Sequence, residues 1–390
     1  MAADREFDIV LFGATGFTGG LTAHYLAEHA PEGLTWAIAG RNEEKLAAVR
    51  DQVTAEQTAA PALVTADASD PDSLAALAAR ARVVISTVGP YLTYGEPVVA
   101  ACAQAGTDYV DLTGEPEFVD RMWLNHHTTA VETGARLVHA CGFDSVPHDL
   151  GAYFTVQQLD PDKPLRLRGV VRSNGSFSGG TFHSAMTALS RARQMKEASA
   201  TRRRVEGRPA GRSSRAVAGK PHRDPRLGYW LLPLPTIDPI IVVRSGAALT
   251  SYGPDFRYSH YAGTKTLRYA AGGATAVGLL GVAARIELTR DLLMGRIHSG
   301  DGPDQERRDK SWFTVDFVGE DGDQMVHTRV SGGDPGYSET AKMLAESALC
   351  LALDDNPEAA GQLTTAVAMG DSLLARLQRA GMNFEVVEPA

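Results

Sequence analysis

Short apolar runs alternate with helical patterns along the first third of the chain. Each run is long enough for one strand, and the segments between them repeat their apolar residues with a helical period. Strands that alternate with helices pair in parallel through right-handed crossovers. We therefore predict a doubly wound parallel sheet, with strands at 8–12, 34–39, 62–66, 82–88, 107–111 and 136–140 and helices at about 17–30, 42–57, 70–80, 94–106 and 115–133.

The rhythm changes beyond residue 142, where strand patterns become more frequent than helical ones. The pattern predicts strands at 165–172, 237–244, 311–318 and 324–330, helices at about 180–200 and 265–293, and loops at 201–236 and 295–310. The tail has a helical pattern rich in Ala and Leu over about 338–380. These changes divide the chain into an α/β domain at 1–140, a second α/β domain with a mixed sheet at 141–337, and C-terminal helices at 338–390 that pack back on the first domain.

The composition suits a globular protein of two domains. The chain has 390 residues, of which 44% are hydrophobic and 22% charged. Its three cysteines, Cys102, Cys141 and Cys350, lie far apart without metal-ligand spacing, so we expect buried thiols and no metal. The charged start leads directly into a strand, which predicts no signal peptide and a cytoplasmic location. The uncharged stretch 269–284 falls short of the roughly 20 residues of a membrane span; a buried helix is expected, with an interfacial helix or a lipid-tunnel wall as the alternative.

The formal charge of −9 hides a strongly basic segment. Residues 191–226 contain twelve Lys or Arg and three acids, a net charge of +9. Because large apolar residues are scarce there, we predict a mobile loop over about 200–228. Its charge suits an anionic partner, such as a phosphopantetheine carrier, a CoA phosphate or a lipid surface, and the choice stays open. No aromatic platform accompanies the charge, so we expect no nucleic-acid binding.

A glycine pattern joins the first predicted strand to the first helix. Gly13 permits a tight turn, Gly16 leaves room for a pyrophosphate, and Gly19 lets the helix approach the strand. The helix N-terminus then offers free N–H groups to the phosphates. Its position inside a strand–helix–strand unit predicts a dinucleotide-binding Rossmann domain. The residues expected to bind the cofactor here are Gly13, Ala14, Thr15, Gly16, Phe17, Thr18 and Gly19.

The second predicted strand indicates which dinucleotide is bound. An NAD-binding unit usually carries an acidic residue at this strand end, and here Arg41 stands in its place. An arginine there accommodates the 2′-phosphate, so we predict NADP(H), with Asn42 and Lys45 assisting. Asn42 is also a good helix N-cap. After the third strand, Asp67 and Ala68 are expected to meet the adenine, and capping of the next helix is an equal alternative for Asp67.

The fourth predicted strand ends in a turn at the same edge of the sheet. Since the carboxyl ends of parallel strands form the ligand edge of such a sheet, this turn is expected to lie near the nicotinamide. The residues predicted to bind the cofactor there are Thr87, Val88, Gly89 and Pro90.

Six segments together resemble the saccharopine dehydrogenase-like NADP-binding family, and more narrowly the bacterial trans-acting enoyl reductases of mycobacterial lipid assembly. They are GATGFTGG (13–20), AGRNEEKL (39–46), STVGPYLTYGEPVV (86–99), YVDLTGE (109–115), CGFDSVPHDLG (141–151) and AVAMGDSLL (366–374). The likeness covers both ends of the chain and is weakest across 195–310.

The resemblance implies a Rossmann domain, a substrate and dimerisation domain, and a homodimer. For the enoyl reductase branch it implies NADPH-dependent reduction of a carbon–carbon double bond in a polyketide or fatty acyl chain held on a synthase carrier. It also implies a link to glycolipid synthesis at the inner face of the plasma membrane, where the protein would associate peripherally. The lysine-pathway enzymes, which act on a C–N bond, are a more distant match. A non-catalytic, lipid-associated NADP-binding role is a third hypothesis.

Reduction of an activated alkene needs a donor for the enolate oxygen and a proton for the α-carbon. Tyr91 and Tyr94 follow the strand end nearest the expected nicotinamide, and Asp144 follows the sixth strand at the same edge. We predict these three as catalytic residues. The alternative is that Tyr91 only packs and that Asp144 only caps a helix. The spacing Tyr261 to Lys265 matches the YxxxK pair of short-chain dehydrogenases, but it lies far outside the Rossmann unit and is interpreted as chance.

Overall fold

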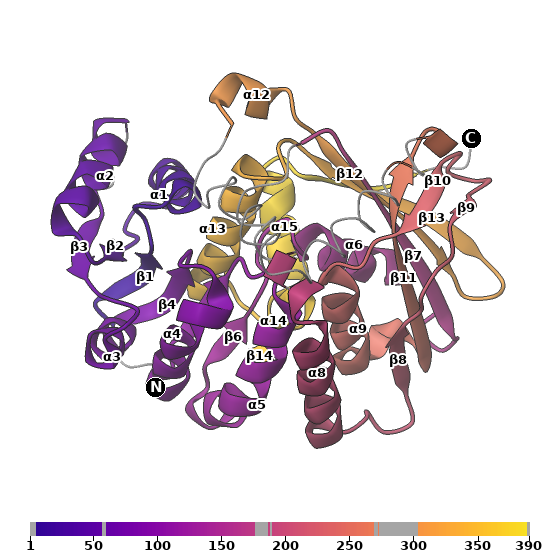
Figure 1. The fold of residues 1–390 in the computed structure, drawn as a ribbon, viewed down its shortest axis with the longest axis horizontal. Helices are drawn as coiled ribbons and strands as arrows, with labels where there is room; N and C mark the ends of the chain where they lie inside the picture. The colour runs from indigo at the N-terminus through magenta and orange to yellow at the C-terminus, as the bar shows by residue number, and fades with distance from the viewer. Residues whose placement is uncertain are drawn as a thin grey trace.

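The computed structural model describes residues 5–56, 60–175, 186–187, 189–268, 272 and 303–387 (Figure 1). Most of the helix predicted over 265–293, including all of the uncharged stretch 269–284 except residue 272, lies outside the described residues, as does part of the helix predicted over 180–200. Within the described part of the chain, no helix is both long and apolar enough to cross a bilayer.

The first sheet is parallel throughout and confirms the predicted doubly wound order. Its strands lie in the order β14-β6-β5-β4-β1-β2-β3, which is the Rossmann arrangement with one further strand at the β6 edge. The strands are β1 (Phe7–Phe12), β2 (Trp36–Gly40), β3 (Ala62–Thr65), β4 (Ala81–Ser86), β5 (Asp108–Asp111), β6 (Arg136–Val138) and β14 (Gly361–Leu363). The seventh strand, β14, was not predicted and comes from the C-terminal tail.

Alternating residues of the sheet build two separate cores. In β1, Ile9 and Leu11 face one layer of helices, while Val10 and Phe12 face the other. α3, α4 and α5 cover the Phe12 face, and α1, α2 and the tail helix α13 cover the opposite face. The helices are α1 (Phe17–His29), α2 (Glu43–Glu56), α3 (Pro71–Arg80), α4 (Tyr91–Ala105), α5 (Pro116–Thr133) and α13 (Ser338–Leu353).

The second domain contains a mixed eight-stranded sheet, as predicted for its class. The order is β15-β13-β12-β7-β11-β10-β9, with β8 paired to β11; β7 runs parallel to β11, and β12 runs antiparallel to β7. Its strands are β7 (Leu165–Ser173), β8 (Ser213–Ala216), β9 (His222–Arg223), β10 (Trp230–Pro233), β11 (Asp255–Thr264), β12 (Phe313–Glu320), β13 (Met325–Gly332) and β15 (Asn383–Val386). Its helices are α6 (Val146–Val156), α8 (Ala192–Glu206), α9 (Asp238–Ala248), α12 (Gln305–Asp309) and the short 3₁₀ helix η1 (Thr250–Tyr252).

The strand predicted over 237–244 is wrong, because this segment forms helix α9. Asp238 and Pro239 occupy its first turn, where an acid and a proline both favour a helix start. The apolar run that follows is short, and a short run does not distinguish a buried helix from a strand. Local start signals therefore outweighed the β-branched residues of the run.

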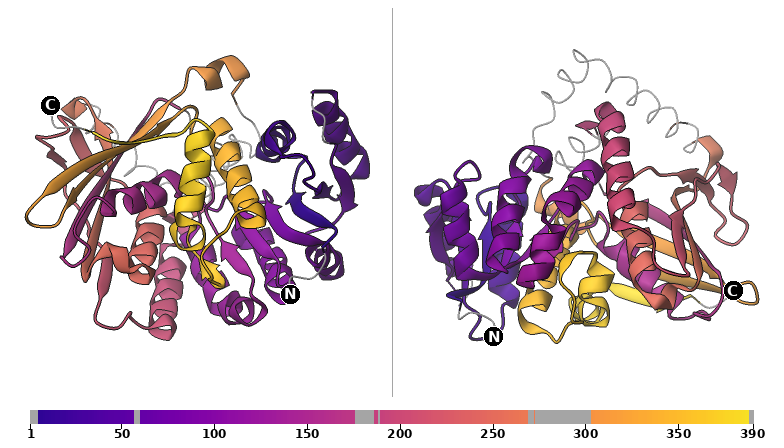
Figure 2. Two further views of the ribbon diagram at one scale, coloured as in Figure 1. Left: turned by 180° about the vertical axis from the view of Figure 1, so that it is seen from behind. Right: turned by 90° about the horizontal axis from the view of Figure 1, so that it is seen from below.

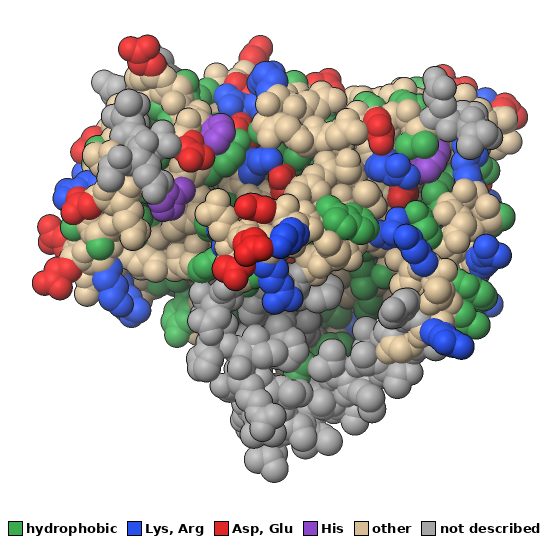
Figure 3. All heavy atoms as spheres, turned by 90° about the horizontal axis from the view of Figure 1, so that it is seen from above, with side chains coloured by type: hydrophobic (Ala, Val, Ile, Leu, Met, Phe, Trp, Pro, Cys, Tyr) green, Lys and Arg blue, Asp and Glu red, His purple; other side chains and the backbone are tan. Residues whose placement is uncertain are grey.

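The basic segment is also more ordered than the predicted loop at 200–228. Its first part is the end of α8, and its later part supplies β8 and β9. Arg202 is buried, and its guanidinium pairs with Asp120 on α5 at 2.5 Å and with Glu206. Arg191 pairs with Glu117 of the same helix at 2.6 Å. These pairs attach α8 to the first domain. The face in Figure 3 carries Lys and Arg side chains over both domains, interspersed with acidic and apolar ones.

The C-terminal tail serves both domains. α13 packs on the first sheet through buried residues such as Leu344 and Ala348, and β14 extends that sheet at Arg136–Val138. α14 (Thr365–Ala368) and α15 (Gly370–Arg379) then lead to β15, which pairs with β13 of the second sheet. Figure 2 shows α13 and α15 between the two sheets. The predicted return to the first domain is therefore only part of what residues 338–387 do.

Candidate active site

One large cleft lies between the two domains and has a volume of about 790 Å³. The first domain lines it with residues that follow β1, β2, β3 and β4. The second domain contributes the ends of β7 and β11 and the start of α6. The carboxyl edge of the Rossmann sheet thus faces the second domain, as expected for a ligand site in a doubly wound fold.

The glycine turn has the shape of an anion cradle. Gly13 has a φ of +98°, and a Cβ at Gly19 would lie 2.2 Å from the Gly13 carbonyl oxygen, so neither position admits a side chain. A Cβ at Gly16 would meet only that carbonyl, at 3.4 Å. Helix α1 starts directly after Gly16, without a side-chain cap and without an acidic residue in its first turn. Its N–H groups are therefore suited to a pyrophosphate.

Most of the predicted cofactor residues line the cleft. These are Gly13, Thr15, Gly16, Phe17, Thr18, Gly19, Arg41, Asp67, Ala68, Thr87, Val88, Gly89 and Pro90. Three predicted residues do not line it. Ala14 is buried, Asn42 accepts a hydrogen bond from the Lys45 N–H at 2.8 Å as the cap of α2, and the Lys45 side chain is exposed. Phe12, Gly40 and Ser69 line the cleft and were not predicted.

Arg41 and Asp67 line the cleft at the carboxyl ends of β2 and β3. The Asp67 carboxylate accepts hydrogen bonds from the Ser69 N–H at 2.9 Å and the Ser69 hydroxyl at 2.8 Å. These bonds, with a smaller effect of Arg41, hold the pKa of Asp67 below its usual range. The cap of α3 is Asp70. Asp67 is therefore not the cap of α3, and it faces the cleft as the cofactor interpretation requires.

The two predicted tyrosines lie in the first turn of α4, which starts three residues earlier than predicted. The Tyr91 hydroxyl is buried, donates to the Ser86 carbonyl at 2.9 Å and accepts from the Leu112 N–H at 3.1 Å. Burial raises the pKa of Tyr91 well above its usual range. Tyr94 is 46% exposed and lines the cleft. Tyr94 is therefore better placed than Tyr91 to reach a ligand.

The segment YVDLTGE positions this helix. The Glu115 carboxylate accepts hydrogen bonds from the N–H groups of Tyr91 and Leu92, at 3.1 and 2.9 Å, at the start of α4. Asp111 contacts Nδ1 of His139 at 2.7 Å and accepts from the Ala140 N–H at 3.0 Å. The motif residues thus tie β5, β6 and α4 together below the cleft.

The second half of the cleft contains a group of titratable side chains: Asp144, His148, Asp238 and His260. Burial, with the charge of Asp238, raises the pKa of Asp144 to about 7. Nδ1 of His148 lies 3.2 Å from one Asp238 oxygen, and Nε2 of His260 lies 3.4 Å from the other. Burial lowers the pKa of both imidazoles, that of His260 to about 3.

Asp144 was predicted and His148 lies in the segment CGFDSVPHDLG, whereas Asp238 and His260 were missed by the sequence analysis. Asp238 lies on the helix that was predicted as a strand, and His260 lies on β11, which was not predicted. No local spacing joins them to His148, since the three residues come from α6, α9 and β11. Only the packing of these elements brings the side chains together.

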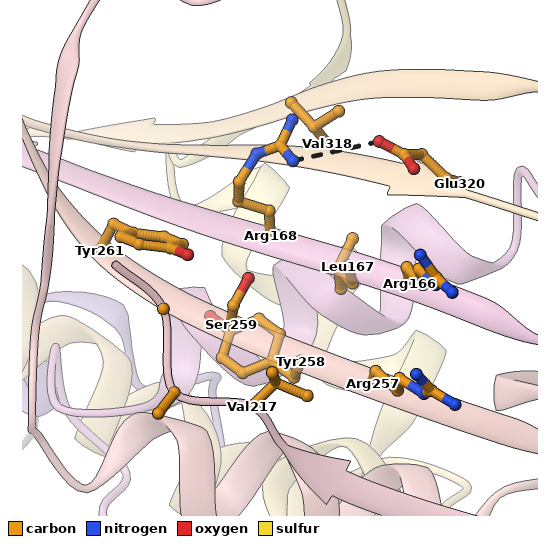
Figure 4. Close-up of a pocket in the computed structure, with 12 residues that line it drawn as sticks. Arg166, Leu167, Arg168, Val217, Arg257, Tyr258, Ser259, Tyr261, Val318 and Glu320 are labelled. Carbon is orange, nitrogen blue, oxygen red and sulfur yellow. Dashed lines mark ion pairs between the residues drawn. The ribbon is translucent and has the colours of Figure 1, made fainter. Parts of the chain in front are cut away.

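A smaller cavity of about 290 Å³ lies in the second sheet, on the amino-terminal side of the β7 residues that line the cleft (Figure 4). Arg166, Arg168 and Arg257 surround it. Arg168 contacts Asp224 at 3.1 Å and Glu320 at 4.0 Å, and Arg257 pairs with Asp255 at 2.8 Å. Much of its positive charge is thus paired, and the chemistry of the large cleft is absent from it.

Comparisons with known proteins agree with this geometry. A family model described as the saccharopine dehydrogenase NADP binding domain matches residues 9–138. A Mycobacterium bovis BCG protein named trans-acting enoyl reductase is 38% identical, over 97% of both chains. A Mycobacterium tuberculosis protein, named provisionally for the same activity, is 40% identical over 100% of this chain and 99% of its own.

The chain belongs to the family of trans-acting enoyl reductases. Its relationship to that family covers the second domain and the tail as well as the Rossmann domain. The first domain is therefore the NADP-binding domain of an oxidoreductase, in agreement with Arg41 and the glycine turn.

A solved structure shows the same fold at lower sequence identity. Apo saccharopine dehydrogenase (L-Glu forming) from Saccharomyces cerevisiae superposes with a TM-score of 0.58 at 13% identity, over 97% of this chain and 99% of that one. This chain thus shares the fold of that saccharopine dehydrogenase. The resemblance and the fold class predicted from the sequence are confirmed.

Proposed function

We propose that this protein is an NADPH-dependent enoyl reductase acting on a carbon–carbon double bond next to a thioester carbonyl. The observation that carries the proposal is the identity of 38–40% with trans-acting enoyl reductases along essentially the whole chain. The cleft supports it, because the dinucleotide half and the titratable half form one continuous space.

NADPH supplies a hydride to the β-carbon, so the protein has to steady the enolate oxygen and deliver a proton to the α-carbon. Asp144 lines the cleft, and with a pKa of about 7 it is partly protonated at neutral pH. Tyr94 lines the cleft from the first domain. We assign Asp144 the role of acid and Tyr94 that of hydrogen-bond donor. Tyr91 is assigned a positioning role, since its hydroxyl already bonds to two backbone groups.

The lining of the second half favours an acyl substrate over an amino-acid one. Apolar side chains, including those of Leu112, Phe143, Val171 and Leu234, contribute to this part of the cleft. Among the described lining residues, Arg172 is the one Lys or Arg that the second domain supplies. A substrate with several carboxylates, as in saccharopine chemistry, would need a concentration of basic groups there.

The proposal extends to the setting of the reaction. The acyl or polyketide chain would be an intermediate of complex lipid biosynthesis, presented on a synthase carrier domain to a homodimeric, peripherally membrane-associated enzyme in the cytoplasm. An apolar cleft wall and exposed basic side chains on the second domain, such as Arg203, Arg204 and Arg208, support this setting. Carrier domains with phosphopantetheine arms and anionic lipid surfaces are both negatively charged.

The test is NADPH oxidation with a long-chain 2-enoyl thioester, presented both on CoA and on an acyl carrier domain, with NADH as a control. We expect turnover with NADPH, and a product saturated at the former double bond. Asp144→Asn should lower kcat by about 10²–10⁴-fold while leaving NADPH binding unchanged. Tight NADPH binding without turnover of any enoyl thioester would contradict the proposal and favour C–N bond chemistry or a non-catalytic role.

A further inference from the structure

Three side chains in the second half of the cleft have the composition of a metal site. His148, Asp238 and His260 offer two ring nitrogens and a carboxylate oxygen that all lie within 4.8 Å of one another. Each residue is at most 5% exposed, and all three line the cleft. They come from three different elements, so the fold itself assembles the group.

The contacts inside this group do not have hydrogen-bond geometry. Nδ1 of His148 and Nε2 of His260 lie 3.2 and 3.4 Å from Asp238, yet among the described residues neither nitrogen has a partner with hydrogen-bond geometry. The same holds for Nε2 of His148, although the Phe143 backbone acts on this imidazole. Buried polar atoms without partners are costly, and each such case in a native fold requires an explanation.

A shared ion accounts for the missing partners, because two ring nitrogens and a carboxylate oxygen lie within 4.8 Å of one another around one point of the cleft. Metal–ligand bonds of about 2.0–2.1 Å in a tetrahedral site hold neighbouring ligand atoms about 3.3–3.4 Å apart. The two nitrogen–oxygen contacts, at 3.2 and 3.4 Å, have similar lengths, although they run to different oxygens of Asp238.

The surroundings have the arrangement that usually supports metal ligands. Nδ1 of His260, the nitrogen turned away from Asp238, contacts the Tyr258 hydroxyl at 3.0 Å. The Ser145 hydroxyl donates to one Asp238 oxygen at 3.3 Å, and the Thr236 hydroxyl donates to the other. Outer partners of this kind fix the tautomer and the orientation of the ligands.

We infer that His148, Asp238 and His260 bind one divalent transition-metal ion, of which Zn²⁺ best suits this ligand set. Three protein ligands leave a fourth position for the cleft, as in catalytic zinc sites. The chemistry of such an ion is to polarise a carbonyl oxygen. Metal binding by these residues does not depend on the proposed function. The role of the ion toward a thioester carbonyl rests on the proposed function.

The neighbouring acid has to be tested separately. A bound cation would offset the charge of Asp238, which is the smaller cause of the raised pKa of Asp144; burial, the larger cause, remains. The test of the metal site therefore uses binding, and does not use the pH dependence of turnover.

The experiment begins with untagged full-length protein purified without chelator, whose metal content is measured by mass spectrometry. The protein is then stripped and titrated with Zn²⁺ by calorimetry and with Co²⁺ by visible absorption. We expect one equivalent per chain and the d–d bands of tetrahedral Co²⁺. His260→Gln and Asp238→Asn should abolish stoichiometric binding, and Tyr258→Phe should weaken it about 10–100-fold.

The matched control is His222→Gln, a change of the same kind on β9 outside the cleft, and it should bind like the wild type. Circular dichroism establishes that each variant is folded. Failure of the wild type to bind one equivalent overturns the inference without recourse to any variant, and so does binding that survives both ligand substitutions. No readout contains an enoyl substrate, so the proposed function can fail independently.

Discussion

Two neighbouring glycines in the first turns of α1 differ in the space around them for a side chain. A Cβ at Gly19 would lie 2.2 Å from the Gly13 carbonyl, whereas a Cβ at Gly20 would meet only the Ala14 carbonyl, at 3.8 Å. The tight contact lies where the helix approaches the turn, and the open one lies on a helical surface. The same substitution at the two positions therefore separates close packing from helix propensity.

We expect Gly19→Ala to lower the free energy of unfolding by about 1–3 kcal/mol, because the turn has to move to admit the methyl group. NADPH binding should weaken with it. Gly20→Ala should instead stabilise the protein by roughly 0.5–1 kcal/mol. Denaturant unfolding and NADPH titration of both variants measure these effects. Equal effects at the two positions would contradict the packing argument.

Arg41 is expected to select the cofactor. A charged hydrogen bond to the 2′-phosphate contributes about 1.5–3 kcal/mol, so Arg41→Asp should lower kcat/KM for NADPH by about 10–100-fold and shift preference toward NADH. Lys45→Asp is the matched control, since it makes the same change of charge at a residue outside the lining of the cleft. Steady-state kinetics with both cofactors, or binding titrations in their place, decide the matter. A similar loss of kcat/KM for NADPH in the two variants would show that the general positive charge of this region, and not Arg41 itself, selects the 2′-phosphate.

Helix α8 is attached to the first domain by a buried ion pair. Arg202 and Asp120 are almost fully buried, and their contact joins an element of the second domain to α5. In contrast, the pair between Arg193 and Glu197 lies on the exposed side of the same helix. Both pairs therefore involve an arginine of α8, but one is buried and the other is exposed.

We expect Arg202→Met to destabilise the fold by about 3–5 kcal/mol, because it removes the cation paired with the buried Asp120 carboxylate and leaves Arg244, which acts on Asp120 through charge alone. Adding Asp120→Asn to this variant should recover part of the loss. Arg193→Met should change stability by no more than about 1 kcal/mol. Urea unfolding of the four proteins gives the comparison, and a small effect of Arg202→Met would mean that water reaches the pair.

Element by element, the sequence predicted what local patterns encode. The six Rossmann strands follow from buried apolar runs, and the cofactor turn follows from Gly13, Gly16 and Gly19. The prediction was wrong for α9, where the start signal Asp238–Pro239 preceded a β-branched run. β14 and β15 are three and four residues long, and their pairing is set by distant strands. The His148, Asp238 and His260 group has no sequence spacing at all, since three elements contribute to it.

The whole molecule is held together across its two domains. The tail contributes β14 to the first sheet and β15 to the second, and α13 fills the face of the Rossmann sheet between them. Separate unfolding of either domain would break these shared elements. The chain should therefore behave as one cooperative unit despite its two sheets.

In calorimetry we expect one unfolding transition, with calorimetric and van't Hoff enthalpies that agree. NADPH, which binds the first domain, should raise the melting temperature of the whole protein; at 100 times its Kd it contributes about 2.7 kcal/mol. In variants that keep one tryptophan each, the near-UV signals of Trp36 in the first domain and of Trp230 in the second should follow the same unfolding curve. Two resolved transitions would show that the tail does not couple the domains.

The path of the tail also bears on how the protein is made. The first six Rossmann strands leave the ribosome before the second domain, but the last strand of that sheet begins at Gly361, after every strand of the second sheet except β15 has been translated. Until then the nascent chain exposes the β6 edge and the sheet face that α13 covers. Synthesis of residues 338–387 thus completes both domains. A chain that stalls or terminates before them would expose apolar surface and an unpaired strand edge to chaperones and proteases.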